Sequence, residues 1–450
     1  MDYTGKTVMV VGMAKSGVSS ARLLLDVGAH VVLYDSKPLD KFPAGAFDEF
    51  AGRAEFAFGP GAESAAQRAD ALVLSPGVPV NLPFILEAKA AGKQVIGEIE
   101  LGYAFSQGEF VAITGTNGKT TTTALTGEIF KNAGFSTFVL GNIGTPIAED
   151  ALKTKPGDVI VAETAALQLE TIETFRPRAC AVLNITEDHL NRYGTMENYI
   201  AAKERVFENQ TSDDFCILNH DNAIARSMAD KPKSKIIFFS RLVALPSGVF
   251  IEKSSIVSAE EDGKHVICRA DEVRIPGAHN IENALAAAAL ARCWRIPEDV
   301  IAETLRTFPG VEHRIEFVRE YRGVRYINDS KGTNPDSTEK AVAAMSAPTV
   351  LILGGSEKNS SFLSLFQGFG PQVRKVIAIG QTKPRILADA AEAGFTGIVT
   401  ADDFEEAVGM ARDMAQPGWN VLLSPACASY DMFEDYEHRG RVFKEIVNLF

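Results

Sequence analysis

The sequence predicts an α/β protein that is built from three domains in series. The length of 450 residues suggests about three domains of roughly 150 residues each. Short apolar runs alternate with helical patterns along most of the chain, and strands that alternate with helices pair in parallel sheets. Turn residues at 308–310 mark a boundary. We therefore expect domains over residues 1–97, 98–309 and 310–450.

The first domain shows the alternation clearly. A helical pattern over residues 19–28 ends at Gly28. The flanking apolar runs have the βαβ order of a Rossmann-like domain. These predicted strands lie at residues 6–12, 30–35 and 69–77.

The second domain begins with another series of this kind. Its predicted strands lie at residues 109–115, 136–141, 158–163 and 179–186. The pattern then changes to short β-like runs, which we expect to form a small antiparallel extension of the central parallel sheet. These runs lie at residues 216–219, 235–240, 248–253 and 265–270, and a helical segment follows at 280–294.

The third domain repeats the α/β alternation, so a C-terminal Rossmann-like domain is expected. Its predicted strands lie at residues 324–330, 349–355, 375–380, 397–401 and 420–426.

Composition excludes several classes of protein. The chain has 45 basic and 58 acidic residues, a formal net charge of −13, and no basic block, which argues against nucleic-acid and anionic-membrane partners. The five cysteines include no C-x-x-C pair, so neither a disulfide framework nor a zinc site is expected. No signal peptide or membrane span is recognisable. We expect a cytoplasmic monomer.

Residues 114–121, TGTNGKTT, have the form of a phosphate-binding loop that follows a strand and begins a helix. The common spacing G-x-x-x-x-G-K-[ST] would place a glycine at position 113, where this chain has Ile113. Gly115 and Gly118 still allow backbone N–H groups to approach phosphate oxygens, Lys119 supplies the positive charge, and Thr120 can bind Mg²⁺. The alternative is a structural turn with an incidental lysine.

Residues 12–17, GMAKSG, resemble the dinucleotide-binding fingerprint, but Ala14 replaces its second glycine. In the functional interpretation Gly12, Ser16 and the helix N-terminus face a pyrophosphate. Asp35, at the end of the next strand, then faces a ribose or base. A tight turn without a ligand is the alternative.

Polar residues follow two strands of the central series. Glu163 ends the strand at 158–163, and Asn184, Asp188 and His189 follow the next one. The carboxyl ends of parallel strands lie at one edge of the sheet, beside the phosphate loop. Glu163 and His189 are therefore candidates to meet a metal or a substrate, although a lone histidine is as often a hydrogen-bonded structural group.

Lys203 lies in an apolar stripe of a predicted helix, with Tyr199 and Phe207 four residues to either side. A desolvated ammonium has a lowered pKa. The neutral amine reacts with CO₂ to give a carbamate, which offers an anionic oxygen to a metal. From helix position alone, a lysine that extends along the stripe to a carboxylate is the favoured alternative.

Together these stretches resemble the Mur ligase family, ATP-dependent amide-forming enzymes of peptidoglycan precursor synthesis. The family loop T-G-T-N-G-K-[ST]-[ST] is matched by residues 114–121. SPGVP (75–79), NDSKGTNPDST (328–338) and LLSPACASYDMFEDYEHRGRVF (422–443) point to the members that add D-glutamate to UDP-N-acetylmuramoyl-L-alanine. The alternative functions are a folylpolyglutamate-type or other amide ligase of similar architecture, a dehydrogenase, and a nucleotide-gated binding protein without catalysis.

The resemblance implies roles for residues in all three domains. UDP-substrate binding would involve Gly12, Ser16, Gly17, Asp35, Ser36, Lys37, Ser75, Pro76, Gly77 and Asn142. ATP would be bound by Gly115, Thr116, Asn117, Gly118, Lys119, Thr120, Thr121, Asn280, Asn283, Arg314, Asp329 and Lys331. Thr120, Glu163, His189 and a carbamylated Lys203 would serve two Mg²⁺ ions. D-glutamate would be bound by Thr333, Lys358, Ser429 and Tyr436. The catalytic set is Lys119, Lys203, His189 and Glu163.

Three positions depart from the family pattern. Ala165 and Ala166 replace a usual pair of serines, Gly332 stands where alanine is common, and Tyr436 replaces a usual phenylalanine. None of these changes removes a charged group that the implied reaction needs. In that reaction the L-alanine carboxylate attacks the γ-phosphorus of ATP, and the D-glutamate amine then attacks the resulting acyl phosphate. His189 either binds metal or orients the amine.

Overall fold

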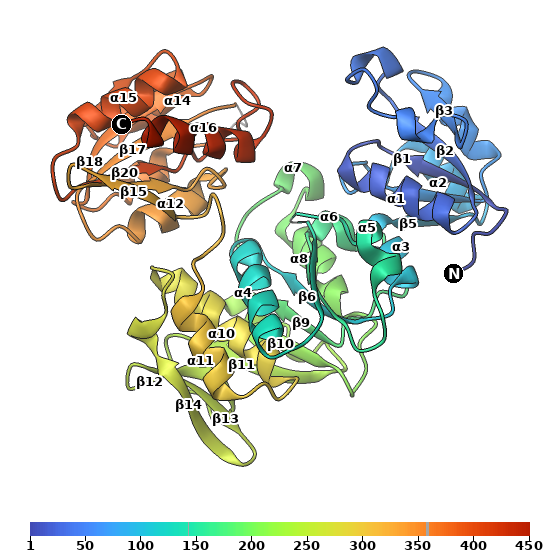
Figure 1. The fold of residues 1–450 in the computed structure, drawn as a ribbon, viewed down its shortest axis with the longest axis horizontal. Coiled ribbons are helices and arrows are strands. Elements are labelled where there is room, and N and C mark those ends of the chain that lie inside the picture. The colour runs from blue at the N-terminus through green and yellow to red at the C-terminus, as the bar shows by residue number, and fades with distance from the viewer. Residues whose placement is uncertain (143, 357–359) are drawn as a thin grey trace. The chain divides into compact units, whose positions relative to one another are not determined.

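The computed structural model describes residues 1–142, 144–356 and 360–450. Within these residues the strands form three sheets, of five, nine and six strands. Figure 1 shows the chain as a ribbon, coloured from the N-terminus to the C-terminus. The predicted α/β class is therefore confirmed. By its internal contacts the chain divides into two units: residues 1–272 with 282–306, and residues 273–281 with 307–450. The domain boundaries at 97 and 309 stay predictions.

The first sheet is wholly parallel, with the order β3-β2-β1-β4-β5. Its centre consists of the most apolar runs, and Val8, Met9 and Val10 of β1 are fully buried. The strands are β1 (Thr7–Val11), β2 (His30–Asp35), β3 (Ala54–Phe58), β4 (Ala71–Leu74) and β5 (Gln94–Gly97), with helices α1 (Lys15–Asp26) and α2 (Pro83–Ala90).

The second sheet has the order β14-β13-β12-β11-β10-β9-β6-β8-β7. Its strands are β6 (Glu109–Thr114), β7 (Thr137–Gly141), β8 (Val159–Glu163), β9 (Ala179–Val182), β10 (Phe215–Asn219), β11 (Lys235–Ser240), β12 (Gly248–Glu252), β13 (Ser255–Glu260) and β14 (Gly263–Arg269). The antiparallel extension is smaller than predicted. Strands β10 and β11 pair in parallel with their neighbours, and only β12–β13–β14 pair antiparallel.

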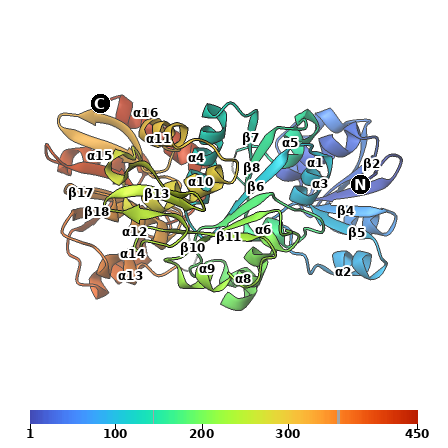
Figure 2. The ribbon, with the colours of Figure 1, turned by 90° about the horizontal axis from the view of Figure 1, so that it is seen from below.

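Helices cover both faces of this central sheet (Figure 2). On one face, side chains of β6, β8, β9 and β10 pack against helices that include α6 and α8. Helix α4 packs against β6, β7 and β8. The helices of this region are α3 (Glu98–Phe105), α4 (Lys119–Asn132), α5 (Ile147–Asp150), α6 (Ala166–Leu169), α7 (Leu190–Tyr193), α8 (Met196–Glu204), α9 (Ala223–Ser227), α10 (Ala278–Arg292) and α11 (Glu298–Thr307).

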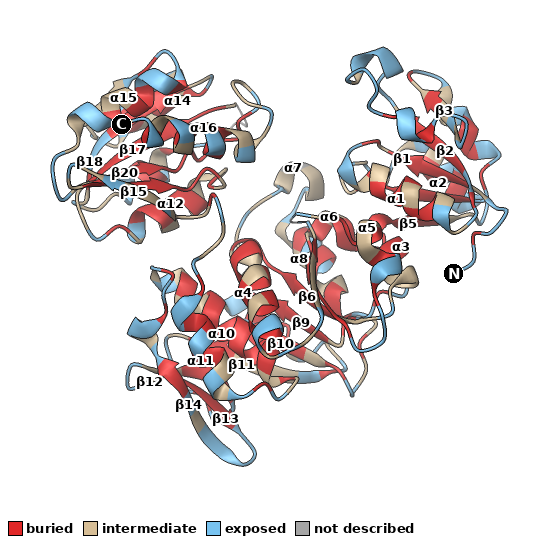
Figure 3. Cartoon of the chain, in the orientation of Figure 1, coloured by how far each residue is buried: buried red, intermediate tan, exposed pale blue. Residues whose placement is uncertain are grey.

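The third sheet has the order β15-β16-β20-β17-β18-β19, and only β15 is antiparallel to its neighbour. The strands are β15 (Glu316–Tyr321), β16 (Val324–Asn328), β17 (Thr349–Gly354), β18 (Val373–Ile379), β19 (Ile398–Thr400) and β20 (Asn420–Leu423). The helices are α12 (Pro335–Ala343), α13 (Leu363–Gln367), α14 (Lys383–Glu392), α15 (Phe404–Met414) and α16 (Tyr436–Asn448). In Figure 3 the strands are mostly buried.

The polar loops at the carboxyl ends of these strands carry most of the predicted site residues. None of the helices in the described part of the chain is both long and apolar enough to cross a membrane.

Candidate active site

The phosphate loop connects β6 to α4, as the sequence predicted. Gly118 has φ +85° and stands directly before the helix. A side chain at Gly118 would lie 2.4 Å from Asn283 Oδ1, and one at Gly115, where φ is +152°, would lie 3.0 Å from Leu183 Cβ. Both glycines are therefore required by the close approach of neighbouring residues as well as by the backbone conformation.

Asn184, at the end of β9, holds the loop in place. Its side-chain oxygen accepts from Asn117 N at 2.9 Å, and its side-chain nitrogen donates to Asn117 O at 3.0 Å. Thr116 N donates to Asn184 O at 2.9 Å. The sequence placed Asn184 near the site but gave it no role. Its position after a central strand was the signal for a loop anchor.

The ammonium groups of Lys119 and Lys203 converge on one carbonyl. Lys119 Nζ donates to Gly115 O at 2.9 Å and to Thr116 O at 2.8 Å, while Lys203 Nζ donates to Gly115 O at 2.8 Å. Thr120 and Thr121 are buried at the start of α4, beside the same loop. When both lysines are protonated they repel each other at this shared acceptor, and an anion at this loop would relieve the repulsion.

Lys203 is buried in the apolar stripe, as predicted, with 2% of its surface exposed. Its ammonium lies 4.7 Å from the centre of the Tyr199 ring. Among the described residues it forms no ion pair with a carboxylate, contrary to the alternative in which the side chain extends to an acid. Burial, and then the charge of Lys119, hold the pKa of Lys203 well below its ordinary value of 10.5. This environment favours the neutral amine.

Glu163 is buried at the end of β8, with 2% of its surface exposed. Asn142 donates to it twice, from its side-chain nitrogen to Glu163 Oε1 at 2.8 Å and from its backbone N to Glu163 O at 2.9 Å. The structure thus brings together Asn142 and Glu163, which were predicted to serve different ligands. A buried carboxylate and the Thr120 hydroxyl are hard oxygen donors, so this set fits Mg²⁺.

His189 stands directly before α7 with φ +54°. Its side chain is 52% exposed, and Nε2 lies 3.7 Å from Asp188 Oδ2. Imidazole nitrogen is a poorer ligand for Mg²⁺ than oxygen is. The exposed ring therefore fits contact with a substrate or with a metal-bound group better than a place in a closed metal site.

The loops predicted to hold the UDP portion meet at the edge of the first sheet. Asp35 Oδ2 accepts from Met13 N at 2.9 Å and Oδ1 from Lys37 N at 3.0 Å. Ser75 Oγ donates to Gly12 O at 2.7 Å. A side chain at Gly17 would lie 1.9 Å from Gly12 O, so Gly12 and Gly17 allow the turn and the helix to pack closely. Asp35 joins two of the loops, a role that the sequence analysis did not assign to it.

Arg192 is a residue that the sequence analysis did not single out. Its guanidinium pairs with Glu170, at 3.1 Å from Nε and 2.6 Å from Nη2, and Nη2 also donates to Val78 O at 3.2 Å. It therefore ties the segment after His189 to the loop at 75–79. A single arginine within a polar stretch gave no sequence signal for this contact.

Asn280 and Asn283, which the resemblance assigns to adenine, are both buried in α10. Asn283 Oδ1 accepts from Thr122 Oγ1 at 3.2 Å, within the first unit. Asn280 Nδ2 donates to Pro276 O at 2.6 Å, within the second. The division between the two units passes through this helix.

In the second unit, Asp329 is the buried centre of the predicted nucleotide residues. Ser424 Oγ donates to its Oδ2 at 2.6 Å, Ile315 N donates to its Oδ1 at 3.2 Å, and Arg314 Nη1 lies 4.0 Å away. Burial raises the pKa of Asp329 to about 6. Ser424 is a further residue without a predicted role.

Three of the four residues predicted for D-glutamate lie in the described part of the second unit. Ser429 is buried, and Thr333 and Tyr436 are half-buried. Lys331 Nζ lies 5.2 Å from the centre of the Tyr436 ring, so the nucleotide and D-glutamate residues are neighbours there. Lys358 lies outside the described residues.

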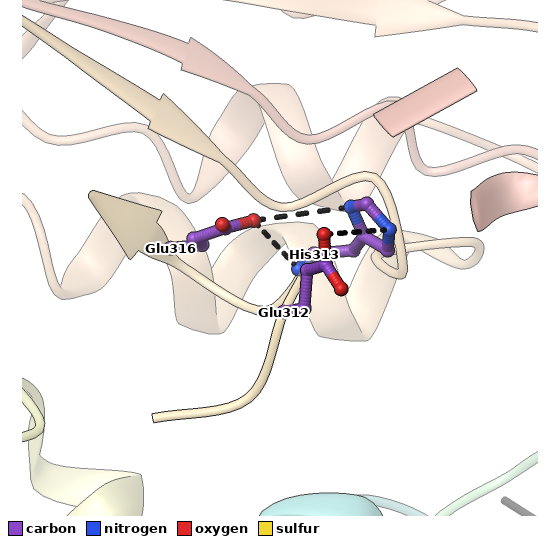
Figure 4. A group of neighbouring side chains, drawn as sticks. All are labelled: Glu312, His313 and Glu316. Atoms are coloured by element: carbon purple, nitrogen blue, oxygen red, sulfur yellow. Dashed lines mark hydrogen bonds and ion pairs between the residues drawn. The ribbon is translucent and has the colours of Figure 1, made fainter. Parts of the chain in front are cut away.

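Beside this region is a charged cluster of Glu312, His313 and Glu316 (Figure 4). Lys444 Nζ lies 2.7 Å from an oxygen of each glutamate, and Asn328 Nδ2 lies 2.9 Å from His313 Nδ1. The lysine already pairs with both carboxylates. The cluster is therefore a support for the segment at 313–316, which carries Arg314, and we do not assign it to a metal.

The structure shows the surroundings of three positions that depart from the family pattern, Gly332, Tyr436 and Ala165. A side chain at Gly332 would lie 2.5 Å from Asp329 Oδ2 and 2.7 Å from Ser424 Oγ. Tyr436 Oη donates to Glu437 Oε1 at 3.1 Å, which satisfies the added hydroxyl. Ala165 N donates to Gln168 Oε1 at 2.9 Å, so α6 begins without a serine cap.

Family models match nearly the whole chain. A Mur ligase MurD-like N-terminal domain matches residues 6–97, a Mur ligase middle domain residues 113–291, and a Mur ligase glutamate ligase domain residues 313–427. The chain belongs to the Mur ligase family.

Two Mur ligases with high identity to this chain are both named UDP-N-acetylmuramoylalanine–D-glutamate ligase. The protein of Pelotomaculum thermopropionicum is 48% identical over 99% of this chain and 98% of its own length. The protein of Clostridioides difficile is 46% identical over 100% of this chain and 99% of its own.

Solved Mur ligase structures share the fold at low identity. UDP-N-acetylmuramate–alanine ligase of Thermotoga maritima superposes with a TM-score of 0.63 at 18% identity, over 99% of each chain. The MurF ligase of the same organism, solved in complex with ADP, gives 0.60 at 15% identity, over 100% of this chain and 96% of its own. These likenesses support the fold alone.

Proposed function

We propose that this Mur ligase is an ATP-dependent acid–amino-acid ligase that joins D-glutamate to UDP-N-acetylmuramoyl-L-alanine in peptidoglycan precursor synthesis. The observation that carries the proposal is full-length identity of 46–48% to enzymes that are named for this reaction. The phosphate loop, with two lysine ammoniums on one loop carbonyl, supports the use of ATP. The products would be ADP, phosphate and the new amide.

The first step activates a poor electrophile. A carboxylate oxygen of the L-alanyl group attacks the γ-phosphorus of ATP, the bond to the β-phosphate oxygen breaks, and ADP leaves. Residues 115–121 would cradle the phosphates, and the Lys119 ammonium would leave the loop carbonyls to meet the developing charge. N–H groups at the start of α4 would donate to the phosphate oxygens.

Two Mg²⁺ ions are proposed as the metals of this site. Thr120, Glu163 and a carbamylated Lys203 would hold them, with His189 as a further candidate. When bound, Mg²⁺ neutralises phosphate charge. The carbamate is supported by the burial of Lys203 and its lowered pKa, because the neutral amine can attack CO₂.

The second step forms the amide. The amine of D-glutamate attacks the acyl carbon, a tetrahedral intermediate forms, and phosphate leaves as the C–O bond breaks. Thr333, Lys358, Ser429 and Tyr436 would bind D-glutamate, and His189 would orient the amine. Asp329, Lys331 and Arg314 would complete the nucleotide site from the second unit.

The test measures ADP release in the presence of Mg²⁺. UDP-N-acetylmuramoyl-L-alanine and D-glutamate are added separately and then together, and L-glutamate replaces D-glutamate as a control. We expect rapid release only with the correct pair. If ADP release is unaffected by either substrate, the protein acts only as an ATPase under these conditions. That result would overturn the assignment of UDP-N-acetylmuramoyl-L-alanine and D-glutamate as its substrates.

A further inference from the structure

Arg439, in the second turn of α16, is the largest fully buried side chain among the described residues, with 0% of its surface exposed. A guanidinium is costly to bury unless its donors are satisfied. Among the described residues no carboxylate lies within ion-pair distance of it. Burial lowers the pKa of Arg439 to about 10, so the group remains charged at neutral pH.

All its donors are directed at two loops. Nη2 donates to Ser330 O at 2.7 Å and to Cys427 O at 3.1 Å, while Nη1 donates to Cys427 O at 3.1 Å and to Ala428 O at 3.3 Å. Ser330 belongs to the loop that carries Asp329 and Lys331. Cys427 and Ala428 directly precede Ser429. One planar side chain therefore joins the predicted nucleotide loop to the predicted D-glutamate loop.

Ser330 extends the network to a third segment. Its hydroxyl accepts from Arg439 Nε at 2.9 Å and donates to Tyr436 O at 2.7 Å. The start of α16, where Tyr436 stands, is thereby fixed against the nucleotide loop. Arg439 thus reaches three of the segments whose side chains are assigned to substrates, without facing the substrates itself.

The surroundings leave room for this side chain and for little else. Gly355 has φ +151°, and a side chain there would lie 2.3 Å from Ala428 O and 3.3 Å from Arg439 Nη1. Ser356 N donates to the same Ala428 O at 2.9 Å. A lysine at 439 would offer one nitrogen where the guanidinium offers three in a fixed plane, so it could not satisfy both loops at once.

We infer that Arg439 is a positioning residue that holds the loops at 329–333 and 427–429 and the start of α16 in one arrangement for D-glutamate and ATP. The inference rests on the proposed function, because the substrates of these loops come from it. The charge is retained inside the domain because its fork of donors matches backbone carbonyls on separate loops. A residue that only stabilised the domain would not single out the substrates of these loops.

The test compares steady-state kinetics of the full-length protein with three variants: Arg439→Lys, Ser330→Ala, and Arg441→Lys as a matched control on the exposed side of the same helix. For Arg439→Lys we expect the KM for D-glutamate to rise by about tenfold to a hundredfold, the loss that accompanies broken hydrogen bonds to a buried charge. The KM for UDP-N-acetylmuramoyl-L-alanine should change by less than about twofold, since its predicted loops lie in the other unit.

Ser330→Ala keeps the guanidinium and its hydrogen bonds to backbone carbonyls, but it removes the hydroxyl that accepts from Arg439 Nε and donates to Tyr436 O. It is a milder change, and so it provides a second test if Arg439→Lys does not fold. We expect a smaller rise in the KM for D-glutamate, of about threefold to tenfold, with the thermal unfolding midpoint close to that of the unmodified protein. Unchanged KM values in a folded Arg439→Lys or Ser330→Ala variant would overturn the inference. An equal rise for all three substrates would also overturn it. If the unmodified protein shows no D-glutamate-dependent ADP release, the proposed function fails instead.

Discussion

Lys119 and Lys203 place two ammonium groups on the carbonyl of Gly115, one from the phosphate loop and one from α8. Lys203 is the one whose pKa is held low by burial and by its neighbour. Conversion of its neutral amine to a carbamate would place an anion beside the Lys119 ammonium, where a protonated Lys203 would be repelled. The same change would add oxygen ligands next to Glu163, which a site for Mg²⁺ requires.

Lys203→Ala should therefore lower kcat by about a hundredfold or more, since losing a metal ligand costs at least as much as losing a residue that hydrogen-bonds to a ligand. Added acetate or formate should restore part of the activity, because a small carboxylate can occupy the vacated space. The assay is ADP release at increasing acetate. Lys119→Ala is the matched control, which acetate should not rescue because the missing group is a cation. A fully active Lys203→Ala variant would contradict the carbamate.

A second prediction concerns Gly332, which lies close to Asp329 and Ser424. A methyl group there would meet Asp329 Oδ2 and Ser424 Oγ at 2.5 and 2.7 Å. Gly332→Ala should lower stability by about 1–3 kcal/mol, the usual cost of overpacking, and should raise the KM for ATP by displacing Asp329. Thermal unfolding measures the change in stability, and steady-state kinetics measure the KM for ATP. Gly409→Ala, in open surroundings within α15, is the control, and equal behaviour of the two variants would refute the prediction.

At the scale of elements, α3 connects the first two sheets and is anchored by buried acids. Glu98 Oε1 accepts from Ala148 N at 2.8 Å, at the start of α5. Glu100 accepts from Glu173 N at 2.9 Å, Thr174 N at 2.8 Å and Phe175 N at 3.0 Å. Glu100 is thus well supplied with donors. Oε2 of Glu98, in contrast, has no hydrogen-bond partner among the described residues.

Burial raises the pKa of Glu98 from 4.5 to about 7. The folded protein therefore holds this proton more tightly than the unfolded chain does, so stability falls as the pH rises from about 4.5 to about 7. Glu98→Gln removes this loss while keeping the acceptor for Ala148 N. We compare the free energy of unfolding of the variant with that of the unmodified protein. The difference should be more favourable to the variant at pH 8 than at pH 5, by up to about 3 kcal/mol.

Thermal unfolding midpoints at the two pH values test this prediction. Glu87→Gln, an exposed position in α2, is the control and should show no pH-dependent gain. If the unfolding midpoint of Glu98→Gln differs from that of the unmodified protein by the same amount at pH 5 and at pH 8, Glu98 does not titrate in this range.

Elements with strong local patterns were predictable from the sequence. The apolar runs of β1, β6, β8 and β17 each lie between two other strands of their sheets, and helix α8 buries Lys203 as its four-residue spacing indicated. Strands β3, β5, β13 and β15 were missed because they are short or because polar residues interrupt their apolar ones. Of the runs predicted to form the antiparallel extension of the central sheet, only those in β12 and β14 pair antiparallel, since the direction in which a strand pairs is set by distant partners.

The same limit applies to the candidate site. Motifs identified the phosphate loop, but its anchor Asn184 lies 67 residues from Asn117. Arg439 is spaced 109 residues from Ser330 and stands in a polar helical stretch, where a charged residue normally faces solvent. Long-range contacts of polar groups leave no periodic signal, so the structure was needed to find them.

At the scale of the whole molecule, the residues proposed for ATP are divided between the two units. Lys119 and Asn283 belong to the first, and Arg314, Asp329 and Lys331 to the second. If both sets bind one nucleotide, we expect a closing motion that assembles the site and excludes water from the acyl phosphate. Small-angle scattering should show a smaller radius of gyration with a non-hydrolysable ATP analogue and both substrates. Superimposable profiles would count against closure.

The most direct test of the proposed reaction follows an oxygen atom. UDP-N-acetylmuramoyl-L-alanine is labelled with ¹⁸O in its carboxylate and incubated with ATP, Mg²⁺ and D-glutamate, and the released phosphate is examined by mass spectrometry. An acyl phosphate intermediate predicts that ¹⁸O passes from the carboxylate to the phosphate as the amide forms. Amide formation with unlabelled phosphate, or phosphate release without amide, would contradict the proposed ligase chemistry.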